Sequence, residues 1–216
     1  MSDLFTLREL DQDGAIEETA ADAGLDTRAA FLRKAGVGAA LIGAGGILTL
    51  PELAGAATPK SDVAILNFAL TLEELEAAFY TEAASKGRFS GKPGQLATVI
   101  GRHERAHVAF LRKALGKAAI KKPKFNFKDT TTDSTKFLQT ARVLEDTGVM
   151  AYAGQGPLLK TKALVVAALS IHSVEARHAA WVRDVLGIPP APASFDAPKT
   201  KAQILAAVKG TGFIVG

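Results

Sequence analysis

The chain of 216 residues contains no Cys, a single Trp and only two Tyr. Without Cys it cannot form disulfide bridges, zinc fingers or iron–sulfur clusters that depend on thiolates. Any metal that it binds must therefore be held by oxygen and imidazole nitrogen atoms. Long apolar runs are also missing, because the most apolar stretch, residues 35–50, is short and rich in Gly. We therefore expect no stable transmembrane span.

Acidic and basic residues are unevenly distributed along the chain. Residues 1–26 contain eight acidic side chains and one Arg, whereas the chain from Lys60 onward is basic. A basic domain can bind nucleic acid, but the densest Lys run, at 117–128, falls on a predicted helix end and a Pro-containing loop. We interpret this run as a solvated loop and expect no nucleic-acid partner.

Residues 1–57 form an N-terminal segment with its own composition. An acidic stretch is followed by a basic segment at 28–34, the apolar stretch 35–50 and a run of small residues at 53–57, which is the order of a secretory signal. The basic segment resembles a twin-arginine signal, with Ala29 where the second Arg belongs. A working signal implies an exported protein of the periplasm or cell envelope. The alternative is a retained N-terminal helix in a cytoplasmic protein.

Residues 58–216 form the second predicted unit, an all-α domain. Apolar residues recur every three or four positions along four segments, which Gly and Pro separate. The outer connections are short and the one at 121–134 is longer, which is the pattern of a four-helix bundle with one long crossover. The predicted helices are 61–86, 94–118, 134–154 and 160–187, with a short C-terminal helix at 199–209.

Two of these helices carry a Glu and a His three residues apart on their apolar stripe. The second helix has Glu104 and His107, and the fourth has Glu175 and His178. Residues three apart lie on one helix face, so each pair can reach a single metal ion. Both pairs occupy positions where a bundle core ordinarily places apolar side chains.

The first and third helices also match each other. Glu73 and Glu145 lie on apolar stripes, and each is followed seven residues later by a Tyr, Tyr80 or Tyr152. Both members of the Glu–Tyr pair are offset by 72 positions between the two helices, and both members of the Glu-x-x-His pair by 71. This internal repeat predicts a bundle with approximate two-fold symmetry about a central site.

Four carboxylates in one core require cations. An unpaired buried carboxylate is costly, and mutual repulsion adds to that cost. Two divalent ions cancel four carboxylate charges, and each His fills a further coordination place. Carboxylate and imidazole donors suit iron and manganese, and zinc is also compatible. We predict a centre of two Fe ions with the ligands Glu73, Glu104, His107, Glu145, Glu175 and His178.

Two features of this set allow alternatives. Glu76 is a rival to Glu73, because both precede Tyr80 on overlapping faces, but only Glu73 keeps the seven-residue spacing that Glu145 shows. Tyr80 and Tyr152 are candidate catalytic residues that hydrogen-bond to the ligand carboxylates. The alternative for both Tyr residues is packing in the core.

The remaining polar and small residues near the motifs receive simpler interpretations. We interpret Glu74 as a solvated residue and Trp181 as a packing residue. His103 and His172 have no repeat partner and are expected at the surface or near helix ends. Gly148, on the inward stripe of the third helix, allows either close helix approach or room for a small ligand.

Four stretches, 66–80, 125–127, 144–152 and 173–181, resemble the ferritin-like domain family that includes the plant and bacterial desiccation-related proteins. The resemblance covers about residues 63–188. The metal pattern is also similar to those of rubrerythrin, bacterioferritin and manganese catalase, and twin-arginine-like leaders are common in the family. The resemblance implies a ferritin-like four-helix bundle with a dinuclear metal centre.

Three functional hypotheses follow. The first is a diiron protein that reacts with O2 or peroxide, as a ferroxidase or peroxide scavenger in oxidative or desiccation stress. The second is a dimanganese, catalase-like enzyme. The third is a structural stress protein in which the metal is a staple. A homo-oligomer is left open by the sequence, and an iron-storage cage is disfavoured by the basic domain and the short helices.

Overall fold

The computed structural model describes residues 42–43, 47–48 and 58–215. The signal or N-terminal helix predicted within residues 1–57 therefore falls mostly outside the described residues. Two short strands, β1 (Ile42–Gly43) and β2 (Ile47–Leu48), pair antiparallel with Ile42 opposite Leu48. These strands belong to a separate compact unit from the helices, and each unit is described by itself.

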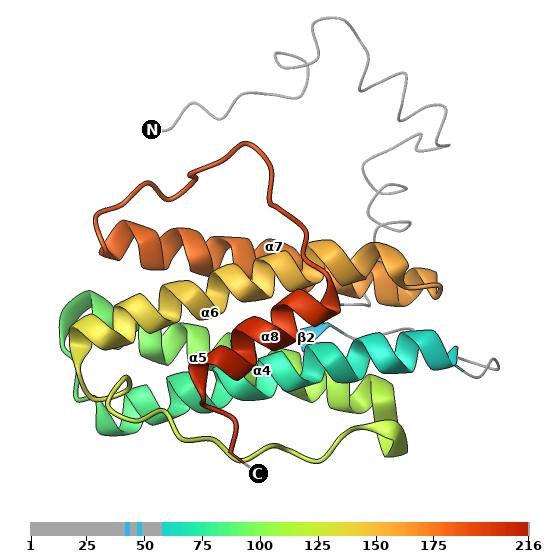
Figure 1. The fold of residues 1–216 in the computed structure, drawn as a ribbon, viewed down its shortest axis with the longest axis horizontal. Coiled ribbons are helices and arrows are strands. Elements are labelled where there is room, and N and C mark those ends of the chain that lie inside the picture. Colours follow the sequence, from blue (N-terminus) through green and yellow to red (C-terminus); the bar gives the residue numbers. More distant parts are fainter. Residues whose placement is uncertain (1–41, 44–46, 49–57, 216) are drawn as a thin grey trace, which may run out of the picture. The chain divides into compact units, whose positions relative to one another are not determined.

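Four long helices form the bundle that the sequence predicts (Figure 1). They are α4 (Lys60–Lys86), α5 (Gly91–Leu115), α6 (Ser134–Gln155) and α7 (Lys162–Val185). Short turns join α4 to α5 and, through η2 (Gly156–Leu158), α6 to α7. After η1 (Gly116–Ala118) the chain runs the length of the bundle before α6 begins. The prediction of an all-α bundle with one long crossover is confirmed, and the predicted helix ends lie within three residues of those observed.

Polar side chains fix several helix starts and turns. Asp133 accepts a hydrogen bond from the backbone N–H of Lys136 and caps α6, as expected at a helix N-terminus. Asp62, which is buried in the first turn of α4, accepts hydrogen bonds from the backbone N–H groups of Lys160 and Thr161. This second contact ties the start of α4 to the turn between α6 and α7, far along the sequence.

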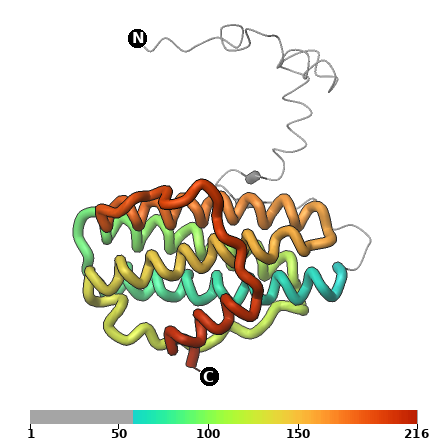
Figure 2. Tube along the Cα trace, turned by 45° about the horizontal axis from the view of Figure 1, so that its top comes forward, coloured from blue at the N-terminus to red at the C-terminus, as the bar shows by residue number. Residues whose placement is uncertain are grey.

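A fifth helix, α8 (Lys201–Thr211), lies across the side of the bundle over α4 and α6 (Figure 2). A capping box of Thr200 and Gln203 starts it. Its apolar residues Ile204 and Val208 join the core cluster, and the Lys201 ammonium lies 5.7 Å from the ring centre of Phe68. The short C-terminal helix is thus confirmed, and it shields the bundle on the side of α4.

Helix α4 is covered on more than one face. Nearly every residue from Phe68 to Tyr80 is buried, Glu74 included. Glu74 accepts hydrogen bonds from the Arg112 guanidinium, at 2.7 Å from Nε, and lies 3.4 Å from the Lys122 ammonium. The prediction of a solvated Glu74 is wrong, because Arg112 and the crossover chain close over this face. None of the helices in the described part of the chain is long and apolar enough to cross a membrane.

Candidate metal centre

The structure brings the six predicted ligands together between the four helices. Glu73 comes from α4, Glu104 and His107 from α5, Glu145 from α6, and Glu175 and His178 from α7. All four carboxylates have no exposed surface, and His107 keeps 12 % of its side-chain surface. Helical spacing explains the convergence, because each Glu and His continues an apolar stripe that faces the bundle core.

The six side chains divide into two overlapping ligand sets. One set is Glu73, Glu104, His107 and Glu175, and the other is Glu104, Glu145, Glu175 and His178. Within each set the ligand atoms lie within 4.8 Å of one another. Glu104 and Glu175 belong to both sets, so each has a place in two adjacent coordination spheres. Six residues could therefore supply four donors to each of two neighbouring metal ions.

Several donor atoms of the cluster are left without a hydrogen-bond partner. Nδ1 of His178 lies 3.0 Å from Glu104 Oε1 and 3.2 Å from Glu145 Oε2. Despite these short distances, the three atoms are not aligned for hydrogen bonds, and they have no hydrogen-bond partner among the described residues. Both carboxylate oxygens of Glu175 also lack a hydrogen-bond partner there. Buried polar atoms without partners are costly. Cations held between them would remove this cost, so the residues fit a metal pair.

The pKa values of several residues in this cluster are strongly shifted from their ordinary values. Burial raises the pKa of Glu73 to about 7, although the nearby His107 opposes the shift. Burial alone would lower the pKa of His178, but the carboxylates of Glu145 and Glu104 raise it to about 11. Burial and the charges of Glu104 and Glu73 raise the pKa of Glu175 well above its usual value. The imidazoles therefore hold protons, and the positive charge of these protons offsets part of the negative charge of the carboxylates, as a metal ion would.

The two Tyr residues hold one carboxylate each. The Tyr152 hydroxyl donates a hydrogen bond to Glu73 Oε1 at 2.5 Å, and the Tyr80 hydroxyl donates to Glu145 Oε1. Each Tyr therefore serves the Glu of the other repeat. Burial and the neighbouring carboxylate raise the pKa of both hydroxyls well above its usual value, so both stay protonated and donate hydrogen bonds. Of the two interpretations from the sequence, the structure favours hydrogen bonding to the predicted ligands.

His103 lies beside the centre, which the sequence analysis did not predict. Its Nδ1 is 2.9 Å from Nε2 of His178, and the two rings stack with centroids 5.2 Å apart. His103 lies within α5 rather than at a helix end and is partly exposed, and its ring stacks on that of His178 because α5 and α7 approach closely. His172 also lies within a helix, partly buried on α7, with Nε2 3.8 Å from Asp196.

The contact with His103 makes the two ligand sets different. A His178 that binds metal through Nδ1 carries its proton on Nε2 and donates it to His103. In the repeat, His103 corresponds to Val174, which has no acceptor to offer. We expect His103→Ala to weaken one of the two metal positions about 10- to 100-fold, as loss of such partners does elsewhere. Calorimetric titration with Mn(II) measures this, and Val174→Ala is the matched control; equal losses in both variants would contradict it.

Glu76 and Gly148 complete the surroundings of the centre. Glu76 is 3 % exposed, so Glu73 and Glu76 both point into the protein. A Cβ atom on Gly148 would lie 3.0 Å from Glu175 Oε2, so Gly148 leaves room for a carboxylate rather than for a helix contact. Trp181 packs against the core cluster, as predicted.

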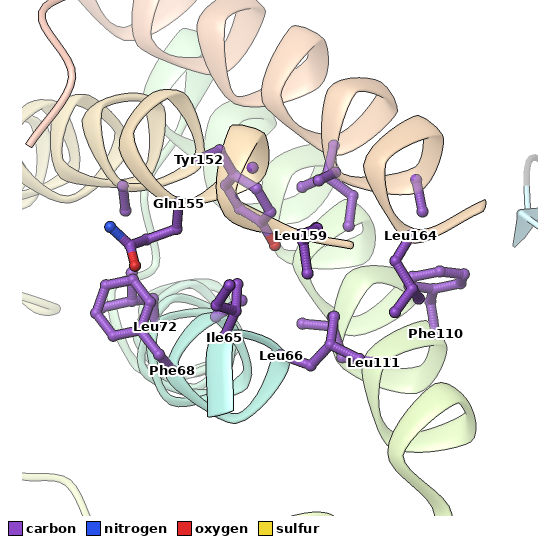
Figure 3. A pocket seen from close by; sticks show the side chains of 16 residues that line it. Ile65, Leu66, Phe68, Leu72, Phe110, Leu111, Tyr152, Gln155, Leu159 and Leu164 are labelled. Carbon is purple, nitrogen blue, oxygen red and sulfur yellow. The ribbon is translucent and has the colours of Figure 1, made fainter. Parts of the chain in front are cut away.

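An apolar cavity lies at one end of the bundle (Figure 3). Its walls come from the start of α4, the end of α5, the end of α6 and the start of α7, and they include Leu66, Phe110 and Leu164. The Tyr152 ring lines the cavity, while its hydroxyl is bonded to Glu73. Tyr152 therefore separates an apolar space from the carboxylate cluster.

Comparison with known proteins agrees with this geometry. A family model described as ferritin-like domain matches residues 61–188. The matched span begins at the start of α4 and ends just after α7, so it contains all the residues of both ligand sets. A search of curated proteins finds no match.

Proposed function

Because this chain belongs to the ferritin-like domain family, we propose that its buried Glu and His cluster is a dinuclear iron centre that reacts with O2. The observation that carries the proposal is the sharing of Glu104 and Glu175 between two ligand sets. A single ion has no use for the second set, whereas two adjacent ions need carboxylates that span them. Carboxylate oxygens with one imidazole for each ion suit iron.

The side chains of the cluster have distinct tasks in this proposal. Glu104 and Glu175 link the two positions, Glu73 and His107 complete one, and Glu145 and His178 complete the other. Two ferrous ions held by these residues would supply the two electrons that, with two protons, convert O2 to hydrogen peroxide. The helices exclude water from the carboxylates, which strengthens every charge interaction in the site.

Tyr80 and Tyr152 orient the outer carboxylates. Each hydroxyl donates a hydrogen bond to Oε1 of its Glu, so that Oε2 faces the imidazole of the same ligand set. Glu73 Oε2 lies 3.1 Å from His107 Nδ1. Glu145 Oε2 lies 3.2 Å from His178 Nδ1. A carboxylate fixed in this way is prepared for metal before metal arrives. Both hydroxyls stay protonated because burial and the neighbouring carboxylate raise their pKa, so we assign them the role of hydrogen-bond donors that keep the outer ligands in place.

The apolar cavity supports O2 as the oxidant. Dioxygen has no hydrogen-bonding need and can enter a space lined by Leu and Phe side chains, whereas peroxide would lose its hydrogen bonds with water there. Tyr152 lies between the cavity and Glu73. The cavity thus gives dioxygen a place next to the metal positions.

Stopped-flow absorbance tests the reaction. Anaerobic protein loaded with two equivalents of Fe(II) is mixed with O2 in one experiment and with hydrogen peroxide in another. We expect ferric absorbance to form with O2 much faster than in a protein-free control. Ferric product no faster than in that control would rule out this chemistry, and reaction with peroxide alone would replace the ferroxidase with a peroxide scavenger.

Manganese and a structural staple are the competing assignments. The same donors bind Mn(II) and Zn(II), so elemental analysis of protein from its native source is the direct comparison. Iron as the major metal supports the proposal, and manganese as the major metal supports a catalase-like enzyme. Metal that stabilises the fold without any turnover supports the staple in a stress protein.

The N-terminal segment supports a location for this activity. The order of basic, apolar and small residues within 27–57 is that of an export signal. We propose that the domain acts outside the cytoplasm, where it would consume O2 or its reduction products at the cell envelope. Fractionation of cells that express the full chain tests this, and a full-length product confined to the cytoplasm would contradict it.

A further inference from the structure

Glu76 has an unusual place in the internal repeat. The offset of 72 that relates Glu73 to Glu145 and Tyr80 to Tyr152 also relates Glu76 to Gly148. In the structure these two equivalent residues face each other, because a Cβ atom on Gly148 would lie 3.6 Å from Glu76 Oε1. A residue that meets its own repeat partner lies close to the axis that relates the two halves. The Glu76 carboxylate is therefore near the approximate two-fold axis.

The same axis passes between the two metal positions. Glu104 and Glu175 are also repeat partners, and both belong to the two ligand sets. The Cβ position of Gly148 that is close to Glu76 is 3.0 Å from Glu175 Oε2. The carboxylates of Glu76, on α4, and Glu175, on α7, therefore both border the space that the absent side chain of Gly148 leaves.

Glu76 also lacks any other explanation. It is 3 % exposed, and among the described residues no hydrogen bond or ion pair involves its carboxylate, although it belongs to neither ligand set and its oxygens are not among the fully buried atoms without a partner. Its neighbour Glu74 is equally buried but is neutralised by Arg112 and Lys122. A buried acidic group with no partner costs the fold stability, which makes a binding partner absent from the protein chain the natural reason for its place.

We propose that Glu76 is a seventh ligand of the centre, held near the two-fold axis where it can bind at either metal position, and that Gly148 leaves the space it needs. The repeat pairs Glu76 with Gly148 for a physical reason, since two Glu residues on the axis would compete for one space. The proposal rests on the proposed metal pair but not on its reaction with O2. It adds a donor that can move between the two positions without any change in the other six.

Titration of the metal-free full-length protein with Co(II) tests this role. Visible absorbance reports the coordination of Co(II), and calorimetry gives the number of ions and their affinities. We expect two ions in the wild-type protein and, in Glu76→Gln, an affinity lower by about tenfold or more together with a changed Co(II) spectrum, since even outer partners of a metal have effects of this size. Gly148→Ala should also weaken binding, because its new methyl group meets Glu175.

The matched control is Glu74→Gln, which changes a buried carboxylate of the same helix outside the centre and should keep the wild-type Co(II) spectrum. Thermal unfolding of the metal-free proteins at pH 8 separates a ligand from a structural residue. Glu76→Gln should be at least as stable as wild type, because it removes an unpaired carboxylate. Wild-type affinity and spectrum in Glu76→Gln, or a metal-free variant that is less stable or fails to fold, would overturn the proposal. A wild-type protein that binds two Co(II) but fails to oxidise Fe(II) would overturn only the proposed reaction.

Discussion

Replacement of Glu104 by Ala is expected to remove both metal ions from the centre, and Glu175→Ala should do the same. Each of these residues belongs to both ligand sets, so its loss takes one donor from each position at once. The loss also leaves the partner carboxylate to face two ions alone. We expect affinity at both positions to fall by more than about 100-fold, beyond the range seen for outer partners of a ligand.

The outer ligands should behave differently. Glu73→Ala and Glu145→Ala each remove a donor from one set only, so each variant should keep one ion and lose the other. Metal per chain, measured after dialysis, distinguishes the two classes, with circular dichroism to verify the fold. Glu82→Ala is the control, because Glu82 bonds to Thr131 and pairs with Lys86 away from the centre. Two ions retained by Glu104→Ala, or equal losses in all four variants, would contradict a shared pair.

The sequence was enough to predict this arrangement because its evidence is repeated. One Glu-x-x-His pair on a helix is a weak signal. Two such pairs and two Glu–Tyr pairs at nearly equal offsets indicate an internal repeat, which places all of them around one symmetric site. Apolar stripes then place all six residues toward the core. Helix number, the crossover and the convergence of the six side chains all followed from this pattern.

The errors have a common physical origin. A stripe indicates which face of a helix meets the core, but it does not show how many other faces are covered. Glu74 is buried because Arg112 and Lys122 reach it from α5 and the crossover. His103 lies beside His178 because α5 packs closely on α7. Both contacts join residues more than 35 positions apart, so a local pattern carries no sign of them.

Glu76 is a different case, because the sequence left it as a rival to Glu73. The two residues lie one turn apart, and helical spacing alone cannot assign one to the core and the other to solvent. Both are buried. The informative signal was Gly148, the glycine at the equivalent repeat position. Its role as the space beside Glu76 is recognised only from the structure, in which the two residues face each other.

Metal should reverse the pH dependence of stability. In the metal-free protein the pKa of Glu73 is raised from 4.5 to about 7 by burial, and the pKa of His178 is raised from 6.5 to about 11 by Glu145 and Glu104 despite its burial. The folded state then binds more protons than the unfolded chain between these values, so its stability falls as the pH rises from about 5 to about 9. The pKa of Glu104 is held well below 4.5, against the effect of burial, by His107 and His178, so its contribution changes only at lower pH.

Metal ions need these same groups without protons, so their affinity rises with pH. Free metal at a thousand times its dissociation constant adds about 4 kcal/mol of stability per site, and each kcal/mol raises the unfolding midpoint by roughly 2–4 °C for a domain of this size. We therefore expect the midpoints with and without Fe(II) or Mn(II) to lie close together near pH 5 and far apart near pH 9. Calorimetric unfolding across this range measures the gap. A gap that stays constant, or that closes as the pH rises, would mean that the buried carboxylates and imidazoles do not exchange protons for metal.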